Sequence, residues 1–287
     1  MNITGKTKIC GLIGDPVEHT MSPPMHNAAF DELGLDYAYL PFRVSPEDLS
    51  SAVSGLKALN SIGFNVTIPH KVNVIPLLDE LDTLAEKIGA VNTVVNNDGI
   101  LKGYNTDASG FLQALLEQDI ELRGKNIVLL GAGGAARAIS YILADRGARL
   151  TILNRREELD WADNIAQNIQ EDFGREVPVF ELLPEYLEKA LSSADILVNA
   201  TSVGMSPNDD FSTVPAELLK PGLVVTDIVY NPVQTRLLRE AVTIGATTVA
   251  GIDMLIWQGA LAFEKWTGRK APFDLMKKVV LEGLGEP

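Results

Sequence analysis

The sequence predicts an α/β protein of two domains, each with a mainly parallel sheet and covering helices. The chain has 287 residues, the length of two domains of ordinary size. Hydrophobic residues make up 46% of it and charged residues 22%, which is typical of a folded globular protein. Short apolar runs alternate with amphipathic segments of helical length, a pattern that indicates strands joined by helical crossovers.

The apolar runs give the expected strands, and helices fill most of the gaps between them. The strands are expected at residues 8–13, 38–42, 63–68, 91–95, 126–130, 150–153, 177–180, 196–199, 224–228 and 247–249. Ser22 and Ser45 each precede a proline. This combination predicts two helix starts that are capped by the serine hydroxyls.

The texture of the sequence changes over residues 107–124, where a helix expected at 109–118 leads to a polar link at 121–125. Helices expected at 254–267 and 273–284 follow the last strand and are rich in aromatic residues in their first part. We expect them to pack back on the first domain. The expected domains are residues 1–108 completed by 252–287, and residues 109–251.

The composition excludes several classes of protein. Lys and Arg number 24 against 38 Asp and Glu, and the resulting net charge of −14 disfavours nucleic-acid binding. The single cysteine, Cys10, lies in an apolar run, so a disulfide within the chain and a cysteine zinc site are ruled out. No stretch approaches the roughly 18 apolar residues of a membrane span, and the N-terminus lacks a signal-peptide core. We expect a soluble cytoplasmic protein that binds neither nucleic acid nor a membrane.

A glycine-rich turn follows the expected strand at 126–130. In Gly131-Ala132-Gly133-Gly134-Ala135-Ala136 the first glycine permits a tight turn, and Gly133 lets a pyrophosphate approach the backbone. The next strand ends at Asn154-Arg155-Arg156, where two arginines suit a 2′-phosphate better than the paired hydroxyls of an NAD ribose. This unit predicts a Rossmann domain that binds NADP. Glu157 and Glu158 partly neutralise the arginines, so NAD stays the alternative.

Polar residues in the first half mark a second candidate site. Lys71 follows the strand at 63–68, at the mouth of the sheet where open parallel sheets bind ligands. It can exchange a proton or provide a fixed charge, although a lone lysine is usually a surface residue. Asp107 suits a helix N-cap as well as a catalytic role. Thr20 and Ser22 lie at a helix start, where free backbone donors suit a carboxylate, unless Ser22 only caps the helix.

Together these segments resemble the shikimate dehydrogenase family, in family order along nearly the whole chain. The matching segments are residues 20–23, 65–71, 89–93, 105–107, the glycine turn, 154–155, 199–205, 230–232 and 254–260. The resemblance implies an enzyme that reversibly reduces 3-dehydroshikimate to shikimate in chorismate and aromatic amino-acid biosynthesis. It also implies that the first domain binds the substrate and the Rossmann domain binds NADP.

The resemblance implies a role for each matching residue. Lys71 and Asp107 would be the catalytic pair, because hydride transfer leaves an alkoxide that an ammonium can stabilise and protonate. Which of the two delivers the proton stays open. The substrate would be bound by Thr20, Ser22, Asn65, Thr67, Asn92, Tyr230 and Gln258. The cofactor would be bound by Gly131, Ala132, Gly133, Gly134, Ala135, Asn154, Arg155, Arg156, Thr201, Val203, Gly251 and Met254.

Two departures from the family pattern leave alternatives. Thr20 stands where the family usually has serine, and Arg156 stands where biosynthetic members usually have threonine. The second feature also resembles the quinate/shikimate dehydrogenase branch, whose members can use NAD. A nucleotide-sensing regulator without activity is less consistent with the presence of Lys71 and Asp107.

We expect no metal site, since the three histidines lack metal-ligand spacing. A monomer and a homodimer fit the sequence equally well.

Overall fold

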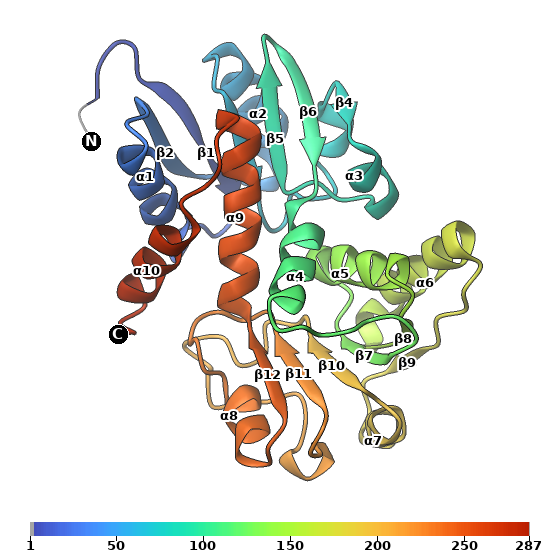
Figure 1. Cartoon of the computed structure of the whole chain (residues 1–287). Helices are drawn as coiled ribbons and strands as arrows, with labels where there is room; N and C mark the ends of the chain where they lie inside the picture. The colour runs from blue at the N-terminus through green and yellow to red at the C-terminus, as the bar shows by residue number, and fades with distance from the viewer. Residues whose placement is uncertain (1–2, 287) are drawn as a thin grey trace. The chain divides into compact units, whose positions relative to one another are not determined.

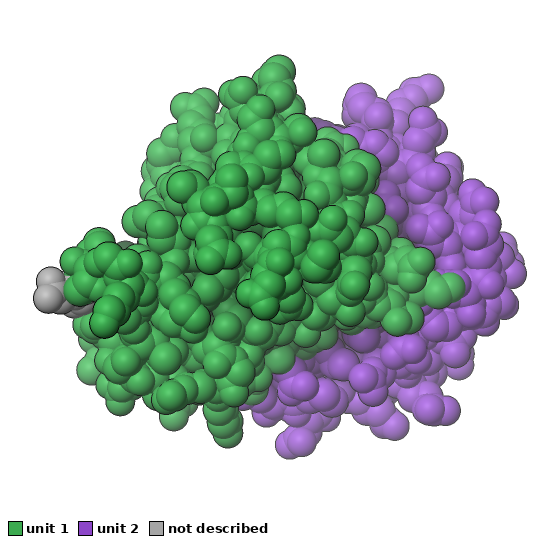
Figure 2. Space-filling model, turned by 90° about the horizontal axis from the view of Figure 1, so that it is seen from above, with its two compact units in different colours: residues 1–109, 256–287 green, residues 110–255 purple. Residues whose placement is uncertain are grey.

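The structure, a computed structural model, describes residues 3–286 (Figure 1). The chain divides into two compact units, drawn in green and purple in Figure 2. Unit 1 comprises residues 1–109 and 256–287, and unit 2 comprises residues 110–255. No helix within residues 3–286 is long and apolar enough to cross a membrane.

Unit 1 contains a six-stranded sheet in the order β2-β1-β3-β5-β6-β4. Its strands are β1 (Lys8–Gly14), β2 (Tyr37–Arg43), β3 (Gly63–Val66), β4 (Glu80–Leu81), β5 (Thr93–Asn97) and β6 (Ile100–Tyr104). Strand β1 is parallel to β2 and β3, and β4 is parallel to β6, whereas β5 is antiparallel to both of its neighbours. The mainly parallel sheet is confirmed, with an antiparallel hairpin inserted in it.

The β5–β6 hairpin is absent from the expected strands, although its turn has a sequence signal. Asp98 and Gly99 connect the two strands, with φ values of 50° and 91°. Two successive residues with positive φ fit the twist of a tight hairpin, and Asp-Gly is a sequence that favours this turn. The expected strand at 91–95 therefore continues to Asn97 and reverses into a second strand.

The helices of unit 1 are α1 (Ser22–Glu32), α2 (Leu49–Ala58), α3 (Thr83–Ile88), α10 (Phe273–Gly283) and parts of α4 (Thr106–Leu116) and α9 (Gly251–Thr267). Neither of the two expected serine caps forms. Ser22 begins α1 but does not cap it: the N-cap is Met21, and no side chain caps the helix. Pro24 has no N–H to offer, and the N–H of Met25 donates to the Met21 carbonyl at 3.3 Å. Ser45 stands at an N-cap, but its hydroxyl donates to Asp48 at 3.0 Å.

The C-terminal helices return to the first part of the chain, as expected. Helix α10 packs on α1, and both lie beside each other in Figure 1. On α9, the indole N–H of Trp266 donates to the carbonyl of Val94 on β5 at 2.9 Å. A helix that is distant in sequence therefore closes one face of the unit 1 sheet, and it brings Gln258 with it.

Unit 2 is a doubly wound Rossmann domain with the parallel strand order β12-β11-β10-β7-β8-β9. Its strands are β7 (Asn126–Leu130), β8 (Arg149–Asn154), β9 (Val179–Glu181), β10 (Ile196–Asn199), β11 (Val224–Asp227) and β12 (Thr247–Ala250), and its helices are α5 (Gly134–Asp145), α6 (Leu159–Phe173), α7 (Pro184–Ser192) and α8 (Arg236–Thr243). Strand order reverses at β7, which lies between β8 and β10. The carboxyl end of β7 is thus the switch point where such sheets bind ligands.

Candidate active site

Lys71 and Asp107 form a largely buried ion pair in unit 1. The Lys71 ammonium donates to Asp107 Oδ2 at 2.6 Å, and the two side chains are 15% and 8% exposed. Lys71 lies in the loop after β3, and Asp107 lies in the first turn of α4. A charge-assisted bond in such a sheltered place is stronger than a neutral one and holds both side chains in fixed positions.

Asp107 is free for this role because another residue caps α4. Asn105 Oδ1 accepts the N–H of Ala108 at 3.1 Å, the contact that a capping side chain makes. The interpretation of Asp107 as the helix N-cap is therefore wrong. Its carboxylate instead lies in the first helical turn, where the helix dipole favours a negative charge.

Asn92 holds the second oxygen of the Asp107 carboxylate. Its amide donates to Asp107 Oδ1 and to Thr106 Oγ1, both at 2.9 Å, and its own oxygen accepts the N–H of Thr106 at 2.7 Å. The same amide nitrogen lies 3.4 Å from Oε1 of Gln258. Four elements of unit 1 therefore bring together Lys71, Asn92, Asp107 and Gln258.

Hydroxyl and amide side chains gather where β1 and β3 end. Thr20 lies in the loop after β1, and its Oγ1 accepts the N–H of Ser22 at 3.2 Å. Thr67 directly follows β3, and Asn65 lies within it. The carboxyl ends of parallel strands meet at one edge of a sheet. This edge therefore carries the predicted residues Thr20, Ser22 and Thr67 from different parts of the sequence.

The glycine turn of unit 2 leaves room for a phosphate. Gly131 has φ +100°, and a β-carbon there would lie 3.0 Å from the carbonyl oxygen of Ala200, so a side chain is excluded. A β-carbon at Gly133 would meet nothing within 4 Å. Gly133 is the N-cap of α5, and no side chain satisfies the first backbone N–H groups of that helix. This open helix N-terminus fits the pyrophosphate of a dinucleotide.

The two arginines at the end of β8 differ in their surroundings. The Arg155 guanidinium forms an ion pair with the Glu158 carboxylate, and this hydrogen bond raises the pKa of Arg155. Arg156 is exposed and forms no ion pair among residues 3–286. Asn154 is buried, and its amide donates to the Glu158 carbonyl at 2.8 Å. Two cations therefore flank the strand end, one of them already paired.

Asp227 joins the loops that follow β10 and β11. Its carboxylate accepts bonds from Asn199 at 2.9 Å, from the Val229 N–H at 3.0 Å and from Thr235 at 2.7 Å. Burial raises its pKa to about 6, against the effect of these three donors. Asn199 in turn accepts the hydroxyl of Thr201 at 2.7 Å. The predicted residues Thr201 and Tyr230 thus lie on loops that share one buried anchor.

Comparison with known proteins decides the family. The sequence pattern of the shikimate dehydrogenase substrate binding domain matches residues 12–94. The pattern of shikimate / quinate 5-dehydrogenase matches residues 114–209, and that of the shikimate 5'-dehydrogenase C-terminal domain matches residues 251–281. The chain belongs to the shikimate dehydrogenase family.

Relatives and solved structures in this family cover the chain from end to end. A protein of Methanopyrus kandleri named shikimate dehydrogenase (NADP(+)) is 51% identical over 287 residues, or 99% of this chain and 98% of that protein. A crystal structure of a shikimate dehydrogenase in complex with NADP+ matches with a TM-score of 0.92 at 45% identity, over 99% of this chain and 98% of the other. Shikimate 5-dehydrogenase from Listeria monocytogenes, in complex with shikimate and NAD, matches with a TM-score of 0.91 at 42% identity, over 97% and 98%.

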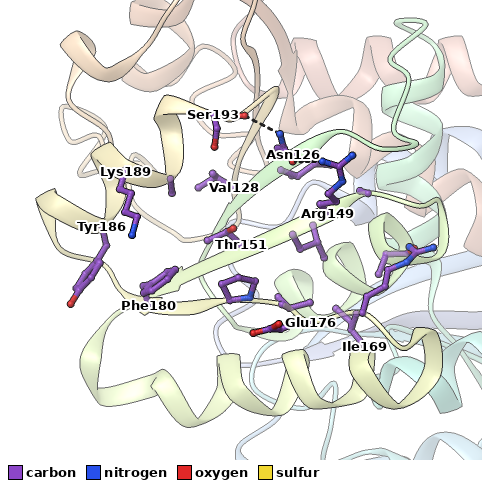
Figure 3. A pocket seen from close by; sticks show the side chains of 18 residues that line it. Asn126, Val128, Arg149, Thr151, Ile169, Glu176, Phe180, Tyr186, Lys189 and Ser193 are labelled. Atoms are coloured by element: carbon purple, nitrogen blue, oxygen red, sulfur yellow. Dashed lines mark hydrogen bonds between the residues drawn. The ribbon is translucent and has the colours of Figure 1, made fainter.

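A groove of about 550 Å³ in unit 2 is separate from the family's phosphate cradle (Figure 3). It is lined by Asn126 and Val128 on β7, by Thr151 on β8 and by Phe180 and Tyr186. Of the side chains labelled in Figure 3, Asn126 and Val128 lie in the first three residues of β7, whereas the glycine turn begins after the carboxyl end of that strand. The lining of this groove therefore does not include the glycine turn.

Two residues that anchor the predicted site residues or their loops carry no strong signal in the sequence. Thr106 stands beside Asp107 and bonds Asn92, but a threonine at a helix start is expected for capping alone. Asp227 ends an apolar run, and its three donors come from segments spread over 37 positions of the sequence, residues 199–235. An acidic residue at the end of a buried parallel strand is the one signal that marks it.

Proposed function

We propose that this chain is an NADP-dependent shikimate dehydrogenase, which reversibly reduces 3-dehydroshikimate to shikimate in chorismate and aromatic amino-acid biosynthesis. The buried pair of Lys71 and Asp107, held by Asn92, carries the proposal. The names of the full-length relatives support it. Unit 1 is the substrate domain in this proposal, and unit 2 is the cofactor domain.

Lys71 delivers the proton in the proposed mechanism. NADPH, when bound, supplies the hydride that converts the substrate carbonyl into an alkoxide. The ammonium of Lys71 has three hydrogens, and one of them is used by Asp107, so the others are free to stabilise and protonate the alkoxide. Asp107 accepts hydrogen bonds at both oxygens and orients the ammonium. In the reverse direction Lys71 takes the proton back.

The remaining polar residues orient the two ligands. Thr20 and Ser22 bind the substrate carboxylate, and the ring hydroxyls are recognised by Asn65, Thr67, Asn92 and Gln258, with Tyr230 nearby. The open N-terminus of α5 binds the pyrophosphate of NADP. Arg155 and Arg156 bind its 2′-phosphate.

Two anionic ligands are compatible with a net charge of −14. At 0.15 M salt the field of exposed charges fades within about 8 Å, so the local donors decide binding. The donors at the two sites are a lysine, two arginines, hydroxyls and the free N–H groups of α5. The overall acidity therefore does not oppose binding at these places.

Steady-state kinetics with two substrates and two cofactors test the proposal. Shikimate and quinate are each assayed with NADP and with NAD, and the highest kcat/KM is expected for shikimate with NADP. A higher kcat/KM for quinate with NAD would place the chain in the quinate/shikimate branch. Tight NADP binding without oxidation of either substrate would instead identify a regulator.

A further inference from the structure

Tyr39 is fixed in the core of unit 1, close to the substrate residues. It lies on β2 and is 1% exposed. Asn27 clamps its backbone from α1, accepting the Tyr39 N–H at 2.8 Å and donating to its carbonyl at 3.0 Å. The ring stacks on that of His26, with centroids 4.5 Å apart and planes 18° apart. Since backbone and ring are both held, the hydroxyl has a defined position.

The Tyr39 hydroxyl contacts two residues of the proposed substrate site. It donates to Asn65 Oδ1 at 2.8 Å, and the side chain of Ser22 lies close enough to lower the pKa of Tyr39 against the larger effect of burial. Because Ser22 does not cap α1, its hydroxyl is available for this contact. One buried hydroxyl therefore links the helix that carries Ser22 to the strand that carries Asn65.

The direction of each hydrogen bond follows from the number of protons. Both amide hydrogens of Asn65 are used, one by the Asn92 carbonyl at 3.1 Å and one by Thr93 Oγ1 at 3.0 Å. Oδ1 of Asn65 can therefore only accept, and Tyr39 must direct its single proton there. Toward Ser22 the Tyr39 oxygen is then an acceptor. The Ser22 hydroxyl can donate either to Tyr39 or to a ligand carboxylate, but not to both, so an effect of Tyr39 on the bound ligand runs through Asn65.

The same contacts lead toward the catalytic pair. Thr93 Oγ1 accepts a hydrogen bond from the amide of Asn65, and the Thr93 hydroxyl donates to Asn92 Oδ1 at 3.2 Å. Asn92 in turn donates to Asp107. A hydrogen-bonded chain of buried side chains thus extends from Tyr39 to the carboxylate that orients Lys71. Buried polar networks of this kind fix a unique arrangement when every member is satisfied.

We propose that Tyr39 is a positioning residue that acts on substrate binding through Asn65 without touching the substrate. The inference rests on the proposed function. It assigns to the hydroxyl, and not to the ring, the task of holding Asn65, so that the Asn65 amide points toward Asn92 and Thr93 and its oxygen keeps a fixed position. Burial raises the pKa of Tyr39 well above its usual value, so the hydroxyl keeps its proton at working pH.

Tyr39→Phe tests the hydroxyl alone, because it keeps the stacked ring. We expect the KM for shikimate to rise about tenfold, as for the loss of one oriented hydrogen bond, with a smaller change in kcat and an unchanged KM for NADP. Tyr141→Phe is the matched control. Its hydroxyl donates to Asp172 at 3.0 Å on the surface of unit 2, and its loss leaves both KM values unchanged.

A double-mutant cycle with Asn65→Ala separates positioning from general destabilisation. If Tyr39 acts through Asn65, the double variant loses less in kcat/KM than the product of the two single losses. Independent effects that simply multiply would overturn the inference, as would a lower melting temperature with unchanged KM values. Should Tyr39→Phe fail to fold, Thr93→Val removes the hydroxyl that accepts the Asn65 amide without altering a residue of the proposed substrate site. It is expected to raise the KM for shikimate selectively, and an unchanged KM in this variant would overturn the inference. Absence of shikimate oxidation by the unmodified protein would instead refute the proposed function itself.

Discussion

The Lys71 ammonium lies 2.6 Å from Asp107 Oδ2, while the amide of Asn92 lies 2.9 Å from the other oxygen of the same carboxylate. Both oxygens of Asp107 are therefore occupied by donors, and the lysine keeps hydrogens for a ligand. In this arrangement Lys71 is the residue that can offer a proton to a ligand, and Asp107 is the residue that orients Lys71. Removing Lys71 is therefore expected to affect activity differently from removing Asp107.

Lys71→Met is expected to lower kcat by about 100- to 10,000-fold, the usual contribution of a positioned acid or base. Asp107→Asn keeps the shape but loses the charge that orients the ammonium, so kcat falls by a smaller factor. Binding of NADP, followed by fluorescence titration, stays unchanged in both variants because they alter unit 1. Equal turnover of Lys71→Met and the unmodified protein would refute the catalytic assignment.

The local signals of Lys71 and Asp107 are weak, because a lysine after an apolar strand is usually a surface residue and an aspartate at a helix start suits a cap. The resemblance to the shikimate dehydrogenase family is what predicts that the two residues form a pair, as they do in the structure. The glycine turn at Gly131–Ala136 has a stronger signal, because a strand precedes it and the next strand ends at Asn154. The apolar residues at 91–95 predict one strand and give no sign of the second strand of the hairpin, β6. The signal for the hairpin is the turn at Asp98-Gly99, which follows the apolar residues.

Contacts between distant polar residues could not be predicted in the same way. Tyr39 stands in an apolar run, where a tyrosine has no feature that distinguishes it from an ordinary core residue. Its contact with Asn65 depends on the parallel pairing of β1 with both β2 and β3. The cap expected at Ser22 was wrong because Pro24 removes a donor that the hydroxyl would need.

The arginines at the end of β8 predict the choice of cofactor. Replacing Arg155 and Arg156 together by alanine removes both cations near the expected 2′-phosphate. We expect the KM for NADP to rise at least about tenfold and that for NAD to change less than about twofold, since only NADP carries the phosphate. Equal losses for the two cofactors would contradict the assignment.

Glu158 is expected to restrain the preference for NADP, because its carboxylate already holds the Arg155 guanidinium. Glu158→Gln keeps a hydrogen-bond acceptor but removes the negative charge. A modest fall in the KM for NADP, about two- to threefold, is expected for an exposed pair that salt screens. The effect should shrink at high ionic strength. Glu157→Gln is expected to lower the KM for NADP less than Glu158→Gln does, because Glu157 acts on Arg155 through its charge alone and raises the pKa of Arg155 less than Glu158 does. A KM for NADP that stays unchanged at low salt would show that Glu158 does not compete.

Gly14 at the end of β1 leaves space for Thr67. A β-carbon at this position would lie 2.2 Å from Thr67 Cγ2, so the threonine would have to move. Gly14→Ala is therefore expected to raise the KM for shikimate several-fold, about 3- to 30-fold, by displacing a residue that positions the substrate. Gly55→Ala in α2 is the control, because a β-carbon there meets nothing within 4 Å and alanine favours a helix. If both variants have the same KM, Thr67 does not contribute to substrate binding.

His26 predicts a loss of stability in acid. It is fully buried between Tyr39 and Phe30, neither ring nitrogen has a hydrogen-bond partner among the described residues, and burial lowers its pKa to about 3. The unfolded chain takes up a proton near pH 6.5, whereas the folded protein does so only near pH 3. Below pH 6.5 the free energy of unfolding therefore falls by up to about 1.4 kcal/mol per pH unit.

Urea unfolding of the whole protein, followed by tryptophan fluorescence at about pH 7.5, 6.5, 5.5 and 4.5, tests this slope. His26→Phe keeps an aromatic ring and loses no hydrogen bond, so the variant should show a flatter dependence on pH. Asp227 acts in the opposite sense: its pKa is raised to about 6, so its contribution to stability increases as pH falls from 6 toward 4. Because Asp227 is present in both proteins, the difference between their slopes isolates His26. Identical slopes would show that His26 is protonated in the folded protein.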